Sequence, residues 1–174
     1  MRSMNSLTTS RQIALAGIFS LVAAMSLPTV AAAQAPTPYG EPISQADAKK
    51  VLAGAEAEAK KNNWPVAITI VDPSGFLVAF SRLDNTQLGS IEISIEKAKT
   101  AAHFRRPTKA LDDALAAGGQ GLRILKIPGA LPLEGGIPIV RDGKIIGAIG
   151  VSGVKSEEDA QIAQAGIDAL LSGK

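Results

Sequence analysis

The sequence predicts an α+β fold, in which an antiparallel β-sheet is built from two hairpins and flanked by helices. Two pairs of short apolar segments, each joined by a tight turn, predict the hairpins. Segments with apolar residues three and four positions apart predict amphipathic helices before, between and after them. No helix separates the two strands of a pair, so parallel βαβ units are not expected. The predicted order is α-ββ-α-α-ββ-α, with the helices packed on one face of the sheet.

The first predicted helix begins at Ser44, which can cap it, and extends to about Asn62. Asp47 stands three residues after the cap, in the position of a capping box. Lysines and glutamates alternate with apolar positions and are expected to face water. The apolar positions predict a buried stripe formed by Ala48, Val51, Leu52, Ala55 and Ala59.

The first predicted hairpin joins residues 66–71 to residues 76–81. Its turn, Asp72-Pro73-Ser74-Gly75, has proline second and glycine fourth, which favours a tight turn. Asp72 and Asp84 lie on either side of the hairpin. We interpret both as turn residues rather than as a catalytic acid/base pair.

Residues 90–104 predict the second helix, which Pro107 ends. Helical spacing places Ile91, Ile95, Ala98 and Ala102 along one face and Glu92, Glu96, Lys99 and His103 along another. Thr108 can cap a third helix, residues 109–119. Residues 122–127 (LRILKI) fit either a strand or a helical turn.

The second predicted hairpin joins residues 137–140 to residues 145–151 around the dipeptide Asp142-Gly143. Gly147, Gly150 and Gly153 indicate close approach of another backbone or a bend. Ser156 is the predicted cap of the last helix, with Asp159 in the capping-box position. The acidic run 157–159 is expected to interact only with that helix end. The core face of the helix is predicted to contain Ala160, Ala163, Ile167 and Leu170.

The amino-terminal segment is typical of a signal peptide. Residues 1–12 carry Arg2 and Arg11 and no acid, residues 13–27 are uncharged and mostly apolar, and Ala31-Ala32-Ala33 offers small residues for cleavage. We therefore predict a signal peptide (1–33), a flexible lead-in (34–42) and one domain (43–174), in the periplasm or secreted. The alternative is an uncleaved anchor, although the apolar run is shorter than the roughly 20 residues that span a bilayer.

Composition excludes several kinds of site. One histidine and no cysteine leave no thiolate site and no multi-histidine zinc site in one chain. Removal of Arg2 and Arg11 with the signal peptide leaves equal numbers of basic and acidic residues. We expect no nucleic-acid partner, because phosphate binding needs a basic face.

His103 is the strongest candidate metal ligand. It could supply an axial ligand to haem iron, with Lys99, Arg105 and Arg106 near enough to pair with the propionates. The alternative is a solvent-facing histidine near a helix carboxyl end, where a partly positive side chain is favoured.

Three stretches resemble the GlcG/HbpS family of haem-binding proteins, which is also known as a haem-degrading domain and occurs at the carboxyl end of PduO-type proteins. These are VDPSGFLVAFSRLD (71–84), EKAKTAAHFRRPT (96–108) and GGIPIVRDGKIIGAIGVSG (135–153). The resemblance implies a homo-oligomer that binds haem, with Thr100, His103 or Thr108 approaching the iron.

The function expected from this resemblance is that of an exported haem-binding protein that stores, senses or transfers haem. One alternative is a small-molecule enzyme, acting in haem degradation or hydroxy-acid chemistry. Another is an oligomeric protein that interacts with an envelope sensor. No membrane span is expected after signal cleavage.

Overall fold

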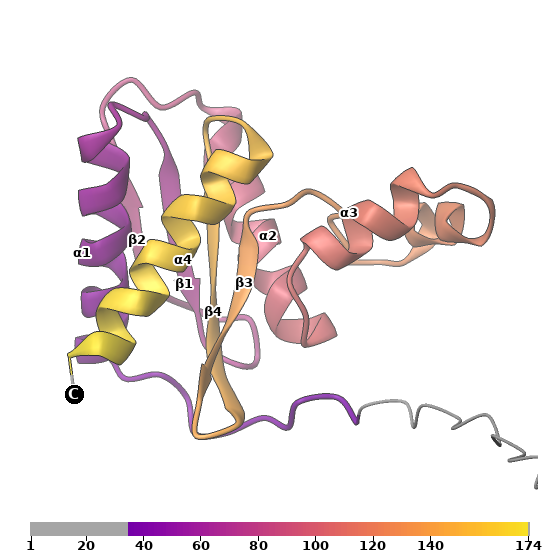
Figure 1. The fold of residues 1–174 in the computed structure, drawn as a ribbon, viewed down its shortest axis with the longest axis horizontal. Coiled ribbons are helices and arrows are strands. Elements are labelled where there is room, and N and C mark those ends of the chain that lie inside the picture. Colours follow the sequence, from indigo (N-terminus) through magenta and orange to yellow (C-terminus); the bar gives the residue numbers. More distant parts are fainter. Residues whose placement is uncertain (1–34, 174) are drawn as a thin grey trace, which may run out of the picture. The chain divides into compact units, whose positions relative to one another are not determined.

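The structure, a computed structural model, describes residues 35–173 and contains a four-stranded antiparallel sheet between two layers of helices (Figure 1). The predicted signal peptide lies outside the described residues. The elements confirm the predicted order, with a 3₁₀ helix added before the second hairpin. They are α1 (Gln45–Lys61), β1 (Ala67–Val71), β2 (Leu77–Arg82), α2 (Gly89–Phe104), α3 (Lys109–Ala116), η1 (Gly119–Lys126), β3 (Gly136–Arg141), β4 (Lys144–Ser152) and α4 (Ser156–Ser172).

The two predicted hairpins are confirmed, and they join through their inner strands in the order β2-β1-β4-β3. All neighbouring strands are antiparallel, and Ile70 of β1 lies opposite Ile149 of β4. Asp142 and Gly143 have φ angles of 50° and 73°. Positive φ at both central residues is what a type I′ hairpin turn requires, and an Asp-Gly pair adopts it readily.

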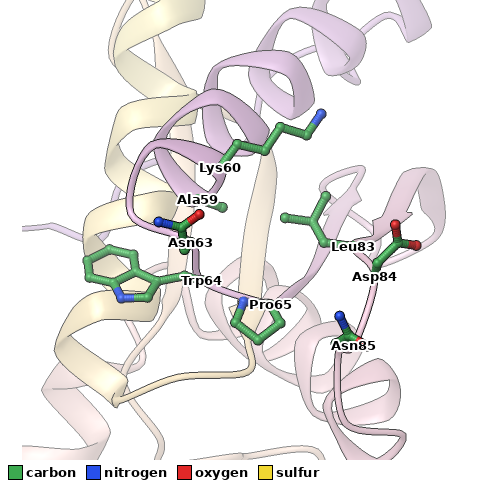
Figure 2. Close-up of a pocket in the computed structure, with 8 residues that line it drawn as sticks. All are labelled: Ala59, Lys60, Asn63, Trp64, Pro65, Leu83, Asp84 and Asn85. Carbon is green, nitrogen blue, oxygen red and sulfur yellow. The ribbon is translucent and has the colours of Figure 1, made fainter.

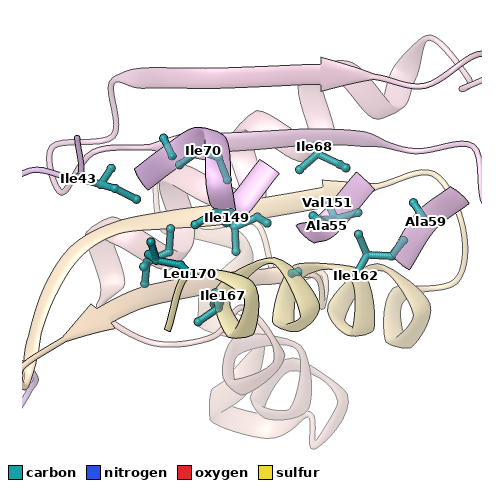
Figure 3. Close-up of a cluster of buried hydrophobic side chains, with 14 of the residues drawn as sticks. Ile43, Ala55, Ala59, Ile68, Ile70, Ile149, Val151, Ile162, Ile167 and Leu170 are labelled. Carbon is teal, nitrogen blue, oxygen red and sulfur yellow. The ribbon is translucent and has the colours of Figure 1, made fainter. Parts of the chain in front are cut away.

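Helices cover both faces of the sheet, so the expectation of helices on one face was wrong. Ile68 and Ile70 of β1 join Ile149 and Val151 of β4 in a core shared with α1 and α4 (Figure 3). The alternate residues face α2, as shown by the cluster of Val71 and Ala148 with alanines of that helix. Strands buried on both faces read as continuous apolar runs instead of alternating ones.

The core beneath α1 and α4 follows the predicted stripes closely. Ala48, Val51, Ala55 and Ala59 are fully buried on α1, and Leu52 is half-buried against the same cluster. On α4, Ala163, Ile167 and Leu170 are buried as predicted, whereas Ala160 is only half-buried. Ser44 accepts a hydrogen bond from the Asp47 amide and so caps α1 as expected.

The ends of two other helices differ from the prediction. α4 begins one residue earlier than predicted, and the residue before it, Lys155, donates its amide to Glu158 in place of the expected Ser156–Asp159 arrangement. α3 does follow Thr108, but the threonine hydroxyl does not cap it. The segment with two alternatives, residues 122–127, is helical as far as Lys126, where η1 ends, and Ile127 is extended.

The expected flexible lead-in differs from the structure at its carboxyl end. Ile145 donates its amide to Pro38, Gly40 donates to Ile145, and Ile43 donates to Ile146, all at 2.7–2.9 Å. These bonds hold the segment beside the start of β4. Within residues 35–173 no helix is both long enough and apolar enough to cross a membrane.

Candidate functional site around His103

α2 carries most of the predicted ligand residues and lies directly on the sheet, packed against β1, β3 and β4. Gly150 of β4 permits this close approach. A Cβ atom at Gly150 would lie 2.1 Å from the Ser94 carbonyl oxygen and 2.5 Å from the Ala98 nitrogen. The glycine predicted to allow a close backbone contact therefore supports α2 itself.

A buried ion pair joins α2 to α4. Lys97 Nζ lies 2.8 Å from Asp159 Oδ2 and 3.0 Å from the Val151 carbonyl oxygen, and Asp159 Oδ1 accepts from the Val154 amide. Burial raises the pKa of the Asp159 carboxyl, and the nearby Lys97 ammonium opposes that rise. The expectation that the acidic run only interacts with its own helix end was therefore wrong for Asp159.

The two candidate threonines, Thr100 on α2 and Thr108 just before α3, are both buried. The Thr100 hydroxyl donates to the Gly129 carbonyl oxygen and accepts from the Leu131 amide, both at 3.0 Å. Thr108 Oγ1 accepts from the Gly136 amide at 2.9 Å, while the Thr108 amide donates to Gly136. Both hydroxyls hold bonds within the chain, and together they fasten the segment between α2 and β3.

His103 lies exposed at the carboxyl end of α2, against the β1–β2 turn. Its Nε2 is 2.9 Å from the Ser74 carbonyl oxygen. A carbonyl only accepts, so Nε2 carries the proton in this contact and the neutral ring presents Nδ1 as its free lone pair. Gly75, with φ 85°, leaves room for the ring, because a Cβ there would lie 2.4 Å from Nε2.

Basic and aromatic side chains surround His103. Tyr39 donates its hydroxyl to the Ala102 and His103 carbonyl oxygens. The Arg105 guanidinium lies 5.4 Å from the centre of the Tyr39 ring, within the range of a cation–π contact. Arg106 is exposed and donates Nε to the Phe104 carbonyl oxygen.

Lys99 lies one turn before His103 on the outer side of α2, where it pairs with Glu96 at 2.9 Å. The structure therefore gathers Lys99, His103, Arg105 and Arg106 at one end of α2. Thr100 and Thr108 are not part of this group, because their hydroxyls bond to the segment before β3 and to β3 itself.

An exposed apolar strip lies beside this end of α2, and sequence reasoning missed it. We call Phe76, Leu77 and Phe80 the β2 strip, and their exposed fractions are 72%, 57% and 37%. Phe80 lies opposite Thr69 in the register, so it projects on the α2 side of the sheet. The pattern FLVAFS predicts a strand, but only the packing decides that α2 leaves this part of it uncovered.

Two cavities lie elsewhere in the described chain. One, of about 400 Å³, lies between the end of α1 and the loop after β2 and is lined by Trp64, Leu83 and Asn85 among others (Figure 2). The other, of about 370 Å³, lies by the start of α1 and is lined by Pro42 and Arg141 among others. Neither includes a predicted ligand residue, and within residues 35–173 no group of three acidic or histidine side chains could hold a metal ion. His103 itself is exposed on the surface of the single chain.

Comparison with known proteins agrees with this architecture. Protein GlcG of Escherichia coli K12 is 44% identical over 110 residues, which are 63% of this chain and 81% of GlcG. A crystal structure of the PduOC–haem complex is 31% identical with a TM-score of 0.67, covering 74% of this chain and 94% of that one. A double mutant of Streptomyces reticuli HbpS is 31% identical with a TM-score of 0.70, covering 75% and 88%. The model of the haem degrading protein HbpS-like family matches residues 43–168, and the chain therefore belongs to the HbpS-like family.

Proposed function

We propose that this protein is an exported haem-binding protein and that haem binds at the carboxyl end of α2, against the β2 strip. The observation that carries the proposal is the position of His103. Its Nε2 contacts Ser74, which leaves Nδ1 for a ligand, and it lies against Gly75, the residue before the exposed Phe76 and Leu77. Support also comes from the family and from the relative whose crystal structure contains haem.

The residues at this end of α2 fit the chemistry of haem. Haem needs an axial ligand, an apolar surface for the macrocycle and cations for its propionates. His103 offers the iron ligand, and Phe76 and Leu77 offer the apolar surface. The cations for the propionates can come from Arg105 or Arg106. When bound, haem supplies an iron centre with an axial position that the imidazole can fill.

The hydrogen bond to Ser74 suits a ligand histidine. Histidines that bind metals commonly donate their second ring N–H to a carbonyl or carboxylate, which fixes the ring and raises the basicity of the ligand nitrogen. His103 keeps this bond if Nδ1 is the ligand. Coordination through Nε2 requires the ring to turn away from Ser74.

A haem titration of the protein lacking residues 1–33 tests the proposal. We expect a Soret band whose position or intensity changes in His103→Ala, while the thermal denaturation midpoint stays near that of the parent protein because the ring is exposed. Leu77→Ser is expected to weaken binding, and Leu171→Ser, a matched change on the far end of α4, is not. An identical Soret band and affinity in His103→Ala removes this residue from the site.

Haem degradation is a second candidate, favoured by the description of the matched family. Incubating the haem complex with a reductant and oxygen distinguishes the two functions. Loss of the Soret band with release of a linear tetrapyrrole indicates an enzyme, and an unchanged band indicates a binding protein.

Export and self-association complete the proposal. The sequence of residues 1–33 supports export, and cell fractionation followed by amino-terminal sequencing tests it, with Gln34 expected as the first residue. Self-association is supported by the one-sided exposure of the His103 surface, since a ligand there needs a second wall.

A further inference from the structure

We infer that copies of this chain associate by docking the arm of one copy into an apolar groove beside β2 of another. We define the arm as residues 109–134, which include α3, η1 and the return segment to β3. The inference rests on the proposed self-association and names the surfaces that carry it. It does not depend on haem.

The groove lies between α2 and the β2 strip. An α-helix turns about 100° per residue. Lys97 and Thr100, which bond to Asp159 and to the arm, therefore lie on one flank of α2, and Ile91 and Ile95 lie on the opposite flank. That flank faces β2, which is at the other edge of the sheet from β3.

Ile91 and Ile95 are only half-buried, although they belong to the apolar face that helical spacing predicts. The sheet face covered by α1 and α4 has two helices, whereas the opposite face has α2 alone over β1, β3 and β4. The groove lined by Ile91, Ile95 and Phe80 is thus the place where a second covering element is missing.

The arm is the complementary surface. Leu122 and Leu125 of η1 are 54% and 66% exposed, and Ile127 and Leu133 nearby are also exposed. Within the arm only Leu111 and Ile124 are buried apolar residues. The burial of two side chains offsets only a small part of the conformational entropy lost when a segment of this length is ordered. A short 3₁₀ helix also adds little stability by itself. Docking would bury the remaining apolar side chains.

Arm and groove cannot meet within one chain, which is why we assign a second copy as the occupant. The arm leaves the fold on the β3 side and points away from β2 (Figure 1). The charges also complement each other. η1 carries Arg123 and Lys126 with no acid in its first turn, and exposed Glu92 lies on α2 next to Ile91. In the described part of the chain none of these three side chains forms an ion pair.

The test is the mass of the haem-free protein lacking residues 1–33, measured by light scattering after size exclusion. We expect the parent protein to be oligomeric, and Leu125→Asp and Phe80→Asp each to have a lower mass. Leu171→Asp is the control, since this exposed leucine lies on α4, away from both surfaces, and its mass should equal that of the parent. Circular dichroism checks that each variant is folded, and Leu122→Asp replaces any variant that is not.

A mixture of the two variants makes the test specific. The Phe80→Asp copy keeps its arm and the Leu125→Asp copy keeps its groove, so an equimolar mixture should regain a dimer. Recovery supports arm-to-groove docking. If the mixture forms no dimer, or if Leu125→Asp has the mass of the parent protein, the arm-to-groove docking is overturned while self-association stands. A monomeric parent protein overturns both the docking and the proposed self-association. The measurement uses haem-free protein, so it is read separately from the haem titration.

Discussion

The buried Lys97–Asp159 pair leads to the sharpest prediction about stability. The two side chains are 3% and 2% exposed, and their charged atoms are 2.8 Å apart. At an effective dielectric constant near 20, the Coulomb attraction at this distance is about 6 kcal/mol, and desolvation of both ions offsets much of it. Removing one partner of such a pair typically costs about 3–5 kcal/mol, because the other charge stays buried without compensation.

We predict that Asp159→Asn lowers the free energy of unfolding by about 3 kcal/mol, near the lower end of that range. The amide oxygen of asparagine can still accept a hydrogen bond from Lys97, and Val151 still accepts another. The double variant Lys97→Met/Asp159→Asn should be more stable than Asp159→Asn alone, because no unpaired charge remains inside.

Urea denaturation followed by circular dichroism measures these differences. With a slope of about 1–3 kcal/mol per molar urea, a loss of 3 kcal/mol moves the midpoint by roughly 1–3 M. A loss below about 1 kcal/mol for Asp159→Asn, or a double variant as unstable as the sum of the two single variants, would refute the electrostatic reasoning.

The same pair predicts a dependence on pH. Because burial raises the pKa of Asp159 above its ordinary 3.8, the folded chain binds a proton here more readily than the unfolded chain does. The stabilising contribution of this proton is fully present below pH 3.8 and is lost as the pH rises through the raised pKa. Lys97→Met removes the cation that opposes the rise in the Asp159 pKa, so in that variant the loss of stability should extend to higher pH. A pH series of urea midpoints checks this, and equal profiles in parent and variant would contradict it.

Three further predictions follow from single contacts. Thr108→Val leaves the buried Gly136 amide without its acceptor and should cost about 1–3 kcal/mol in urea denaturation; a loss under 0.5 kcal/mol would be inconsistent with that role. Gly150→Ala forces α2 away from β4 and should prevent folding, which soluble yield and circular dichroism report; a folded variant of parental stability argues against the close contact. Hydrogen bonds from the Ser81 hydroxyl and then from Lys60 lower the pKa of Glu56. The stability that the ionised Glu56 contributes is present above its ordinary pKa of 4.5 and is lost as the pH falls through the lowered pKa. Ser81→Ala should therefore unfold at a higher pH than the parent protein on acid titration.

Local pattern was sufficient to predict most of the fold. The Asp-Gly dipeptide at 142–143 adopts positive φ at both positions, as a type I′ turn requires, and it is a strong local signal for a two-residue hairpin between strands. The cap of α1 is an equally local contact, because the Ser44 hydroxyl accepts from the amide of Asp47, three residues further along the chain. The absence of cysteine and the single histidine likewise limit the chemistry without any structure.

Predictions about which face of an element is covered were less successful. Ile91 and Ile95 form an apolar face by helical spacing, yet they are half-exposed because α2 rests on its neighbouring face. Lys97 was not among the candidate residues, and its partner Asp159 is 62 residues away in sequence. A lysine between Ser94 and Ala101 on the buried side of a helix is a weak signal for such a pair, and it did not identify the partner.

The sequence by itself therefore determined the two hairpins, the order of the helices, the absence of thiolate and multi-histidine sites and the resemblance to one family, because each depends on residues close together in the chain. Tertiary structure alone decided that Thr100 and Thr108 fasten the arm, that His103 faces outward against Ser74, and that the β2 strip stays uncovered. The physical reason is that spacing along the chain fixes the directions of side chains around their own element. The strand order β2-β1-β4-β3 then decides which of those directions meet another element.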